Sequence, residues 1–349
     1  MDLFFNIFFP IILVFFTAFS IKYLIVILTH YKVYDIPNKR SNHYYPIPKG
    51  AGLLLTLYIC IAIGLYVMQE KISSPQIEKI SILMLALSFF SFLDDMYSIP
   101  FLKKLFFQIF VVLLGTYLLN QEINLYCSST YGSLILHINY DLYKIIVKIT
   151  ISFLWLWFLN LFNFMDGIDG ITASQIITFS IGVICLAMLK QIDENFLYVG
   201  VILFAIFLGF LCYNKSPARI FLGDSGSITM GFFIASIIII TFLEHKNFTS
   251  LIILVSYYIT DTTITLLKRI YKKQNIFSAH SNHFYQRKIR NGFSHESVLS
   301  KIVLINSLLI ILSINYFNYP FFSIILSILM IIYLLKWLGK TEKKINANK

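Results

Sequence analysis

The chain has 349 residues, of which 58% are hydrophobic and 13% are charged, and its formal net charge is +11. Soluble domains carry about 25% charged residues, so these values exclude a water-soluble globule and a disordered chain and indicate repeated passage through a bilayer. The excess of Lys and Arg is typical of the cytoplasmic loops of a membrane protein rather than of a nucleic-acid partner. We expect an all-α polytopic integral membrane protein.

Eleven apolar runs are long enough to cross a bilayer core of about 30 Å as helices. The first run is too long for a signal peptide and no cleavage site follows it, so we expect it to remain as a membrane anchor. The predicted spans are 3–29, 51–68, 77–93, 101–119, 145–162, 171–189, 196–213, 228–243, 249–267, 302–316 and 319–335.

The loop charges predict the orientation. An odd number of spans places the two termini on opposite sides of the membrane. One set of alternate segments (30–50, 94–104, 163–170, 214–227, 268–301 and 336–349) holds 21 of the 28 Lys and Arg, and the opposite loops hold 5. This set is therefore expected in the cytoplasm, with the N-terminus outside and the C-terminus inside.

The loops leave no room for a separate soluble domain, so residues 1–349 are expected to form a single transmembrane domain. The longest outer loop is 120–144, where Tyr131-Gly132-Ser133 precedes an alternating apolar pattern to Ile138. This pattern predicts a small hairpin on the membrane surface.

The first inner loop reads DIPNKRSNHYYPIPKGAG from Asp35 to Gly52. Its three prolines predict a stiff extended strip. Its cations, among them Lys49, suit a phosphate.

Asp94 and Asp95 end the third apolar run. Adjacent carboxylates repel unless they share a cation or a proton. Lys104, at the start of the next run, returns to the same membrane face and is placed to meet a lipid phosphate. A solvated turn with lysines nearby is the alternative.

The next inner turn reads NLFNFMDGIDG from Asn160 to Gly170. Its amides and carboxylates, at Asn163, Asp166 and Asp169 among them, recur every three residues, and oxygen ligands of this kind suit Mg²⁺. An ordinary Asp-Gly turn is the alternative, but it leaves both asparagines unexplained.

The sequence RIFLGDSGS, from Arg219 to Ser227, precedes another apolar run. Small residues at a helix start expose backbone N–H groups to an anion, and Asp224 is suited to hold a metal that bridges to it. A plain N-cap by Ser225 or Ser227 is the alternative.

The most basic loop contains AHSNHFYQR from Ala279 to Arg287. His280 and His283 lack the further ligands of a usual zinc site, whereas Arg287 and Lys288 favour phosphate binding. A solvated basic face toward lipid headgroups is the alternative. Asp261, near the inner end of its span, is expected to pair with this loop and not to act in catalysis.

These five stretches, in this order and on one membrane side, resemble the polyprenyl-phosphate N-acetylhexosamine-1-phosphate transferase family. The resemblance spans Asp35 to His295 and includes an eleven-helix layout. The patterns DxPNxRSxH and AHxxHxYQR are closer to the O-antigen-initiating branch than to the peptidoglycan branch.

The resemblance implies roles for the motif residues. It makes Asp224 the principal Mg²⁺ ligand, with Asn163 beside it and Mn²⁺ as a substitute metal. The uridine nucleotide, the lipid phosphate and the diphosphate would be bound by different residues. These are Asp166 and Asp169 for the nucleotide, Lys104 with Lys49 for the lipid phosphate, and Arg287 for the diphosphate. The resemblance further implies a catalytic group of Asp94, Asp95, Asp224, His280 and His283.

The resemblance also implies the reaction. Undecaprenyl phosphate would attack the β-phosphorus of a UDP-N-acetylhexosamine, release UMP and start a lipid-linked glycan such as that of lipopolysaccharide. Such phosphoryl transfer needs positioning and charge neutralisation more than covalent help. The expected location is the bacterial inner membrane, with a cytoplasmic site and a homodimer as one expected assembly.

Two other classes remain open from the residues. An intramembrane prenyltransferase would use Asp-rich turns to hold a prenyl diphosphate through Mg²⁺, but it predicts paired DxxxD-type motifs. A transporter or lipid flippase would place charges near the middle of the membrane, whereas the acids here gather at the expected cytoplasmic ends.

Overall fold

The structure is a computed structural model that describes residues 4–37, 45–132, 139–244, 246–275 and 281–340. In these residues eleven helices are long and apolar enough to cross a membrane, so all eleven predicted spans are confirmed. They are α1 (Phe9–His30, extended by a π-helical turn at Phe4–Phe8), α2 (Ala51–Met68), α3 (Pro75–Tyr97), α4 (Phe101–Leu118), α6 (Tyr140–Phe164), α7 (Ile171–Met188), α8 (Asn195–Asn214), α9 (Asp224–Leu243), α10 (Phe248–Tyr271), α12 (His295–Asn315) and α13 (Pro320–Gly339).

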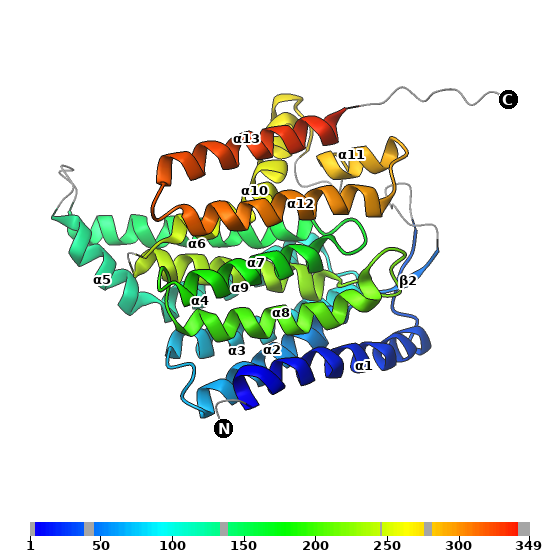
Figure 1. Ribbon diagram of the computed structural model, residues 1–349, viewed down its shortest axis with the longest axis horizontal. Coiled ribbons are helices and arrows are strands. Elements are labelled where there is room, and N and C mark those ends of the chain that lie inside the picture. Colours follow the sequence, from blue (N-terminus) through cyan, green and yellow to red (C-terminus); the bar gives the residue numbers. More distant parts are fainter. Residues whose placement is uncertain (1–3, 38–44, 133–138, 245, 276–280, 341–349) are drawn as a thin grey trace.

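The shorter elements lie at the two ends of the bundle (Figure 1). Helix α5 (Asn120–Tyr131) lies at one end. Helix α11 (Phe284–Arg290) and the antiparallel pair of β1 (Tyr34–Asp35) and β2 (Ile47–Pro48) lie at the other, which we call the α11 end. Helix α1 begins at the α5 end and α13 finishes at the α11 end, as an odd number of crossings requires.

Helix α9 forms the centre of the bundle. Within its span 83% of the residues are buried, against 22% for α1 and 28% for α4. It packs against α3 and α6. Trp155 of α6 stacks on Phe232 of α9 and donates its indole N–H to the Phe232 carbonyl at 2.8 Å. The first residue of α9, Asp224, is therefore held at a fixed place at the α11 end.

Several helices extend beyond the apolar runs that predicted them. Helix α3 continues through Asp94 and Asp95, α9 begins at Asp224, and α12 begins at His295. A span predicted from hydropathy stops at the first charged residue. The helix itself continues where the charged side chains form hydrogen bonds or ion pairs. Three of the acids expected in turns, Asp94, Asp95 and Asp224, therefore lie on the last or first turn of a helix, whereas Asp166 and Asp169 lie in the turn between α6 and α7.

The outer loop differs from the expectation. Residues 120–131 form α5, in which Ile123 and Cys127 are buried four residues apart, the spacing of one helix face. Residues 133–138 of the predicted hairpin lie outside the described residues. The first inner loop is extended where it is described, with Tyr34 opposite Pro48 and Asp35 opposite Ile47.

Candidate active site

Asp95 on α3 caps helix α9. Its Oδ1 accepts the backbone N–H of Asp224 at 3.1 Å, and its Oδ2 accepts that of Ser225 at 3.1 Å. The residue before α9 is Gly223, which has no side chain to offer, so the acceptor that the first N–H groups need comes from another helix. The negative charge also complements the positive end of the helix dipole. Asp95 thereby positions Asp224.

Gly223 allows this approach. Its φ is +78°, and a Cβ on it would lie 2.4 Å from Oδ2 of Asp95. Any other residue would be strained there and would push α3 away from the start of α9. Lys49 forms an ion pair with the capping carboxylate, with its Nζ 3.6 Å from Oδ1 of Asp95.

Lys104 lies between two carboxylates. Its Nζ donates to Oδ2 of Asp94 at 2.7 Å and lies 3.6 Å from Oδ2 of Asp224. Oδ1 of Asp94 accepts the backbone N–H of Ile99 at 2.6 Å, which fixes this carboxylate to the α3–α4 corner. The structure thus brings Asp94, Lys104 and Asp224 together from three helices.

A cavity of about 620 Å³ opens beside this group. One part is polar, with Lys104, Asp166, Asp224 and other hydrogen-bonding side chains in its wall, and the other is apolar and lies between α4, α6 and α10. The remaining polar lining residues are Gln108, Asn160, Asn163, His283 and Gln286, and the apolar lining includes Phe101, Leu105, Phe153, Leu156, Trp157, Phe164, Ile228 and Leu266. Such a cavity suits an amphiphile with a charged head.

Asn163 is joined to α9. The hydroxyl of Ser227 donates to Oδ1 of Asn163 at 2.7 Å and also to the Gly223 carbonyl at 3.1 Å. Asn160, one turn earlier on α6, donates to Oε1 of Gln108 at 3.0 Å. Gln108 was not predicted as a site residue, although a polar residue inside a membrane span is itself a functional signal.

The turn between α6 and α7 places Asp166 in the cavity wall. Burial, with the charges of Asp95 and Asp35 adding to it, raises the pKa of the Asp166 carboxyl to about 6. The next residue, Gly167, packs on α11: a Cβ there would lie 2.3 Å from the Tyr285 hydroxyl oxygen. That hydroxyl donates to the Phe164 carbonyl at 3.1 Å.

Asp169 is held by α12 and by the segment before α9, and its nucleotide-binding role stays a prediction. Its Oδ2 accepts the backbone N–H of Ala218 at 3.1 Å, and its Oδ1 lies 3.2 Å from Nδ1 of His295. Burial acts to raise the pKa of Asp169, but the hydrogen bond and charge of His295, together with the Ala218 N–H, hold it below its ordinary value. Asp169 does not line the cavity described above. It ties the α6–α7 turn to α12.

Asp261 pairs with the basic loop, as predicted. Its Oδ1 accepts the backbone N–H of Phe284 at 3.1 Å and lies 3.2 Å from Nδ1 of His283. Asp261 is fully buried, so this carboxylate anchors the start of α11 and orients the imidazole of His283, which lines the cavity. His280 lies outside the described residues.

The cationic side chains of α11 do not line the cavity. Lys288 is fully buried, donates to the Lys340 carbonyl at 3.2 Å and lies over the rings of Phe293 and Trp337, so the expectation that it binds phosphate is wrong. Arg287 stacks on Phe284, with 4.4 Å from Cζ to the ring centroid, and is not in the lining of the cavity. Its diphosphate role stays a prediction.

The donors in the cavity suit a hard cation. Within the described residues no group of three His, Cys, Asp or Glu is close enough to hold a metal ion by itself. Mg²⁺ needs no such group, because it typically takes one or two protein carboxylates and completes its shell with water and substrate phosphates. The side-chain oxygens of Asp224 and Asn163, both in the cavity wall, fit this need.

The fold and cavity define a polytopic membrane protein with a charged cavity that opens between apolar helices, and the comparisons with known proteins give its class. Residues 78–242 match the model of glycosyl transferase family 4, which confirms the resemblance read from the motifs. The chain is therefore a phosphosugar transferase, and the transporter and prenyltransferase alternatives are set aside.

Two relatives illustrate the match. A probable undecaprenyl-phosphate N-acetylglucosaminyl 1-phosphate transferase of Bacillus subtilis is 27% identical over 278 residues, which are 78% of this chain and 74% of the relative. A phospho-N-acetylmuramoyl-pentapeptide-transferase of Prochlorococcus marinus is 32% identical over 192 residues, which are 50% of this chain and 51% of the relative.

Proposed function

We propose that this protein transfers an N-acetylhexosamine 1-phosphate from a UDP-sugar to undecaprenyl phosphate, with UMP as the second product. The observation that carries the proposal is the single cavity in which Lys104 and Asp224 adjoin an apolar passage between helices. A lipid phosphate requires this combination of a charged end and a lipid-like wall. The Bacillus subtilis relative bears the name of such an activity.

The apolar passage continues along α4 and α6. A second cavity of about 480 Å³ shares Phe153 and Leu156 with the first and extends between these helices to Ile149 and Lys148. From Asn163 to Ile149 the passage follows α6 for about 21 Å. This length of apolar groove supports the binding of a polyprenyl tail whose phosphate remains near Lys104.

In the proposed reaction an oxygen of the lipid phosphate forms a bond to the β-phosphorus of the UDP-sugar. The bond between this phosphorus and the oxygen bridging to the α-phosphate breaks, and UMP leaves with that oxygen. A phosphate monoester is largely a dianion at neutral pH, so the attack needs no proton removal by Asp94. The main requirement is that two anionic groups be held in line.

Lys104 supplies the fixed positive charge for this purpose. Its contacts with Asp94 and Asp224 hold the amine at the polar end of the cavity, where it offsets repulsion between the two phosphates. Asp94 is thereby a positioning residue for Lys104, and Asp95 is one for Asp224. Mg²⁺ held by Asp224 and Asn163 would neutralise the diphosphate of the donor.

The polar side chains across the cavity are placed to receive the nucleotide sugar. Asp166 and His283 lie in its wall. Following the loop charges, we place the α11 end in the cytoplasm of a bacterial inner membrane. Mg²⁺ with Mn²⁺ as substitute, a homodimer and the lipopolysaccharide pathway stay predictions.

The test is an assay of the purified protein with undecaprenyl phosphate, Mg²⁺ and a panel of UDP-N-acetyl sugars. We expect UMP release that depends on the lipid phosphate, with equimolar formation of a lipid diphosphate sugar. Folded protein that releases no UMP with any sugar of the panel would overturn the proposal.

A further inference from the structure

A separate groove lies at the α3–α4 corner, on the opposite face of α4 from the catalytic cavity. Its volume is about 690 Å³. Lys104 and Gln108 of α4 line the catalytic cavity, whereas Lys103, Phe106 and Phe110 line this groove. A ligand bound in the groove therefore cannot reach Asp224 from there.

The floor and wall of the groove are aromatic. Phe90 of α3 and Phe107 of α4 stack with ring centroids 4.0 Å apart and an angle of 15° between the ring planes. Phe106 and Phe110 follow along α4 and are 77% and 52% exposed, on a surface that faces lipid in a spanning helix. From Lys103 to Phe110 the row measures about 10 Å, enough to cover a substantial part of an acyl chain.

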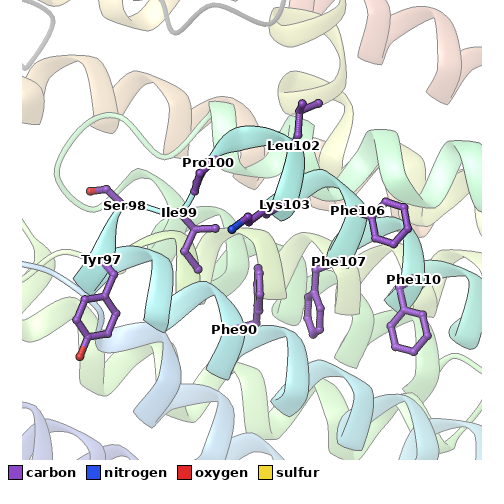
Figure 2. A pocket seen from close by; sticks show the side chains of 10 residues that line it. All are labelled: Phe90, Tyr97, Ser98, Ile99, Pro100, Leu102, Lys103, Phe106, Phe107 and Phe110. Carbon is purple, nitrogen blue, oxygen red and sulfur yellow. The ribbon is translucent and has the colours of Figure 1, made fainter.

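A cation stands at the head of this row. Figure 2 shows the Lys103 amine directed back toward Ile99, above the rings of Phe90 and Phe107. Lys103 is exposed, and the described residues offer it no carboxylate partner at ion-pair distance, in contrast to Lys104. The hydroxyl-bearing Ser98 lines the same opening. A cation at the head of an apolar groove is complementary to an amphiphile that has an anionic head and an apolar chain.

We propose that this groove binds an anionic phospholipid, with its phosphate at Lys103 and one acyl chain along Phe106, Phe107 and Phe110. The cytoplasmic leaflet, to which the loop charges assign this end of the bundle, is rich in such lipids. The occupant is distinct from the acceptor lipid, whose phosphate must reach Lys104 and Asp224 on the other face of α4. A phospholipid bound here covers the α3–α4 corner at Ile99, whose backbone N–H is bound by Asp94.

The experiment is native mass spectrometry of the full-length protein titrated with phosphatidylglycerol or with zwitterionic phosphatidylcholine. We expect Lys103→Gln to weaken phosphatidylglycerol binding by about fivefold, the factor that one lysine near a membrane surface contributes. Phosphatidylcholine binding should change little, and Lys103→Arg should restore the preference for phosphatidylglycerol.

The matched control is Lys336→Gln, which removes an exposed charge from α13 at the same end of the bundle. It should leave phosphatidylglycerol binding as in the wild type. Equal weakening in both glutamine variants, or none in Lys103→Gln, would overturn the site. Stoichiometric displacement of the bound phosphatidylglycerol by undecaprenyl phosphate would overturn the assignment to a phospholipid.

Discussion

The carboxylate of Asp95 accepts the backbone N–H of Asp224 at 3.1 Å, across 129 residues of sequence. The cap of α9 and the candidate catalytic carboxylate are therefore adjacent in space, on different helices. Asp94 and Asp95 are adjacent in the sequence, but the structure gives their carboxylates different partners. Asp95 holds a helix, and Asp94 holds Lys104.

We expect Asp95→Asn to lower both stability and activity, because an amide accepts one of the two N–H groups and repels the other. Loss of a helix cap costs about 1–2 kcal/mol. Asp94→Asn leaves the cap intact and should lower activity with a smaller change in the thermal unfolding midpoint. The midpoints in detergent, read by intrinsic fluorescence, distinguish the variants, and equal midpoints would contradict the division of roles.

Lys104→Gln is expected to lower kcat/KM by about 100-fold or more, as is typical when a charge that stabilises a transition state is removed. The loss also leaves Asp94 and Asp224 facing each other without a cation between them. Lys336→Gln removes an equal charge elsewhere at the α11 end and should retain the wild-type rate. Similar kinetics for both variants would show that Lys104 acts only through general charge.

The pH profile tests Asp166, whose pKa is raised from an ordinary value of 3.8 to about 6. As the pH falls through 6 the carboxylate becomes protonated, so an activity that needs its charge declines. The lipid phosphate monoester also gains a proton near pH 6. We therefore expect log kcat/KM of the wild type to fall with a slope approaching about 2 below pH 6.

Asp166→Asn should retain only the phosphate titration, with a slope of about 1 and a lower rate throughout. The assay is the initial rate of UMP release between pH 5 and pH 8 in each protein. Identical slopes in the two proteins would mean that the Asp166 charge is not required.

Much of the fold could be predicted because a membrane span has a local signal. Each of the eleven apolar runs corresponds to one of the eleven candidate membrane-spanning helices found in the described residues. Helix α5 gave no such signal, since its apolar face carries few residues, among them Ile123 and Cys127. The pairing of Asp261 with the basic loop was predictable because both lie near the inner end of one span.

The parts of the site that depend on distant pairing were not predictable. No local pattern shows that the carboxylate of Asp169 pairs with His295. Nor does one show that the side chain of Lys288 is buried beside Trp337. Likewise nothing in the sequence assigns Lys103 and Lys104 to opposite faces of α4. Asp169 and His295 are 126 residues apart in the sequence, and the burial of Lys288 and the two faces of α4 likewise follow from how the helices pack.

Gly167→Ala tests the contact of the α6–α7 turn with α11. The added methyl group would lie 2.3 Å from the Tyr285 hydroxyl oxygen, so we expect α11 to shift and activity to fall by about tenfold or more. The double variant Gly167→Ala/Tyr285→Phe removes that oxygen and should recover part of the rate. Tyr285→Phe alone is the reference, and absence of any recovery would place the defect elsewhere.

The groove between α4 and α6 is tested at Ser152, which lines it and hydrogen-bonds Thr116 at 2.8 Å. Ser152→Trp fills the groove and should raise KM for undecaprenyl phosphate. It should have little effect on geranyl phosphate, whose chain is too short to reach this position. Ser152→Ala removes the same hydrogen bond without filling the space and should behave as wild type toward both acceptors. An equal effect of the tryptophan on both lipids would argue against this path for the tail.

The measurement that tests the central claim most directly is the simultaneous assay of UMP and lipid product with wild-type protein and Asp224→Asn. The account predicts equimolar UMP and polyprenyl diphosphate N-acetylhexosamine from the wild type. It predicts neither from an Asp224→Asn protein with the wild-type elution profile and unfolding midpoint. Wild-type turnover by Asp224→Asn, or no product from the wild type with any UDP-N-acetyl sugar, would contradict it.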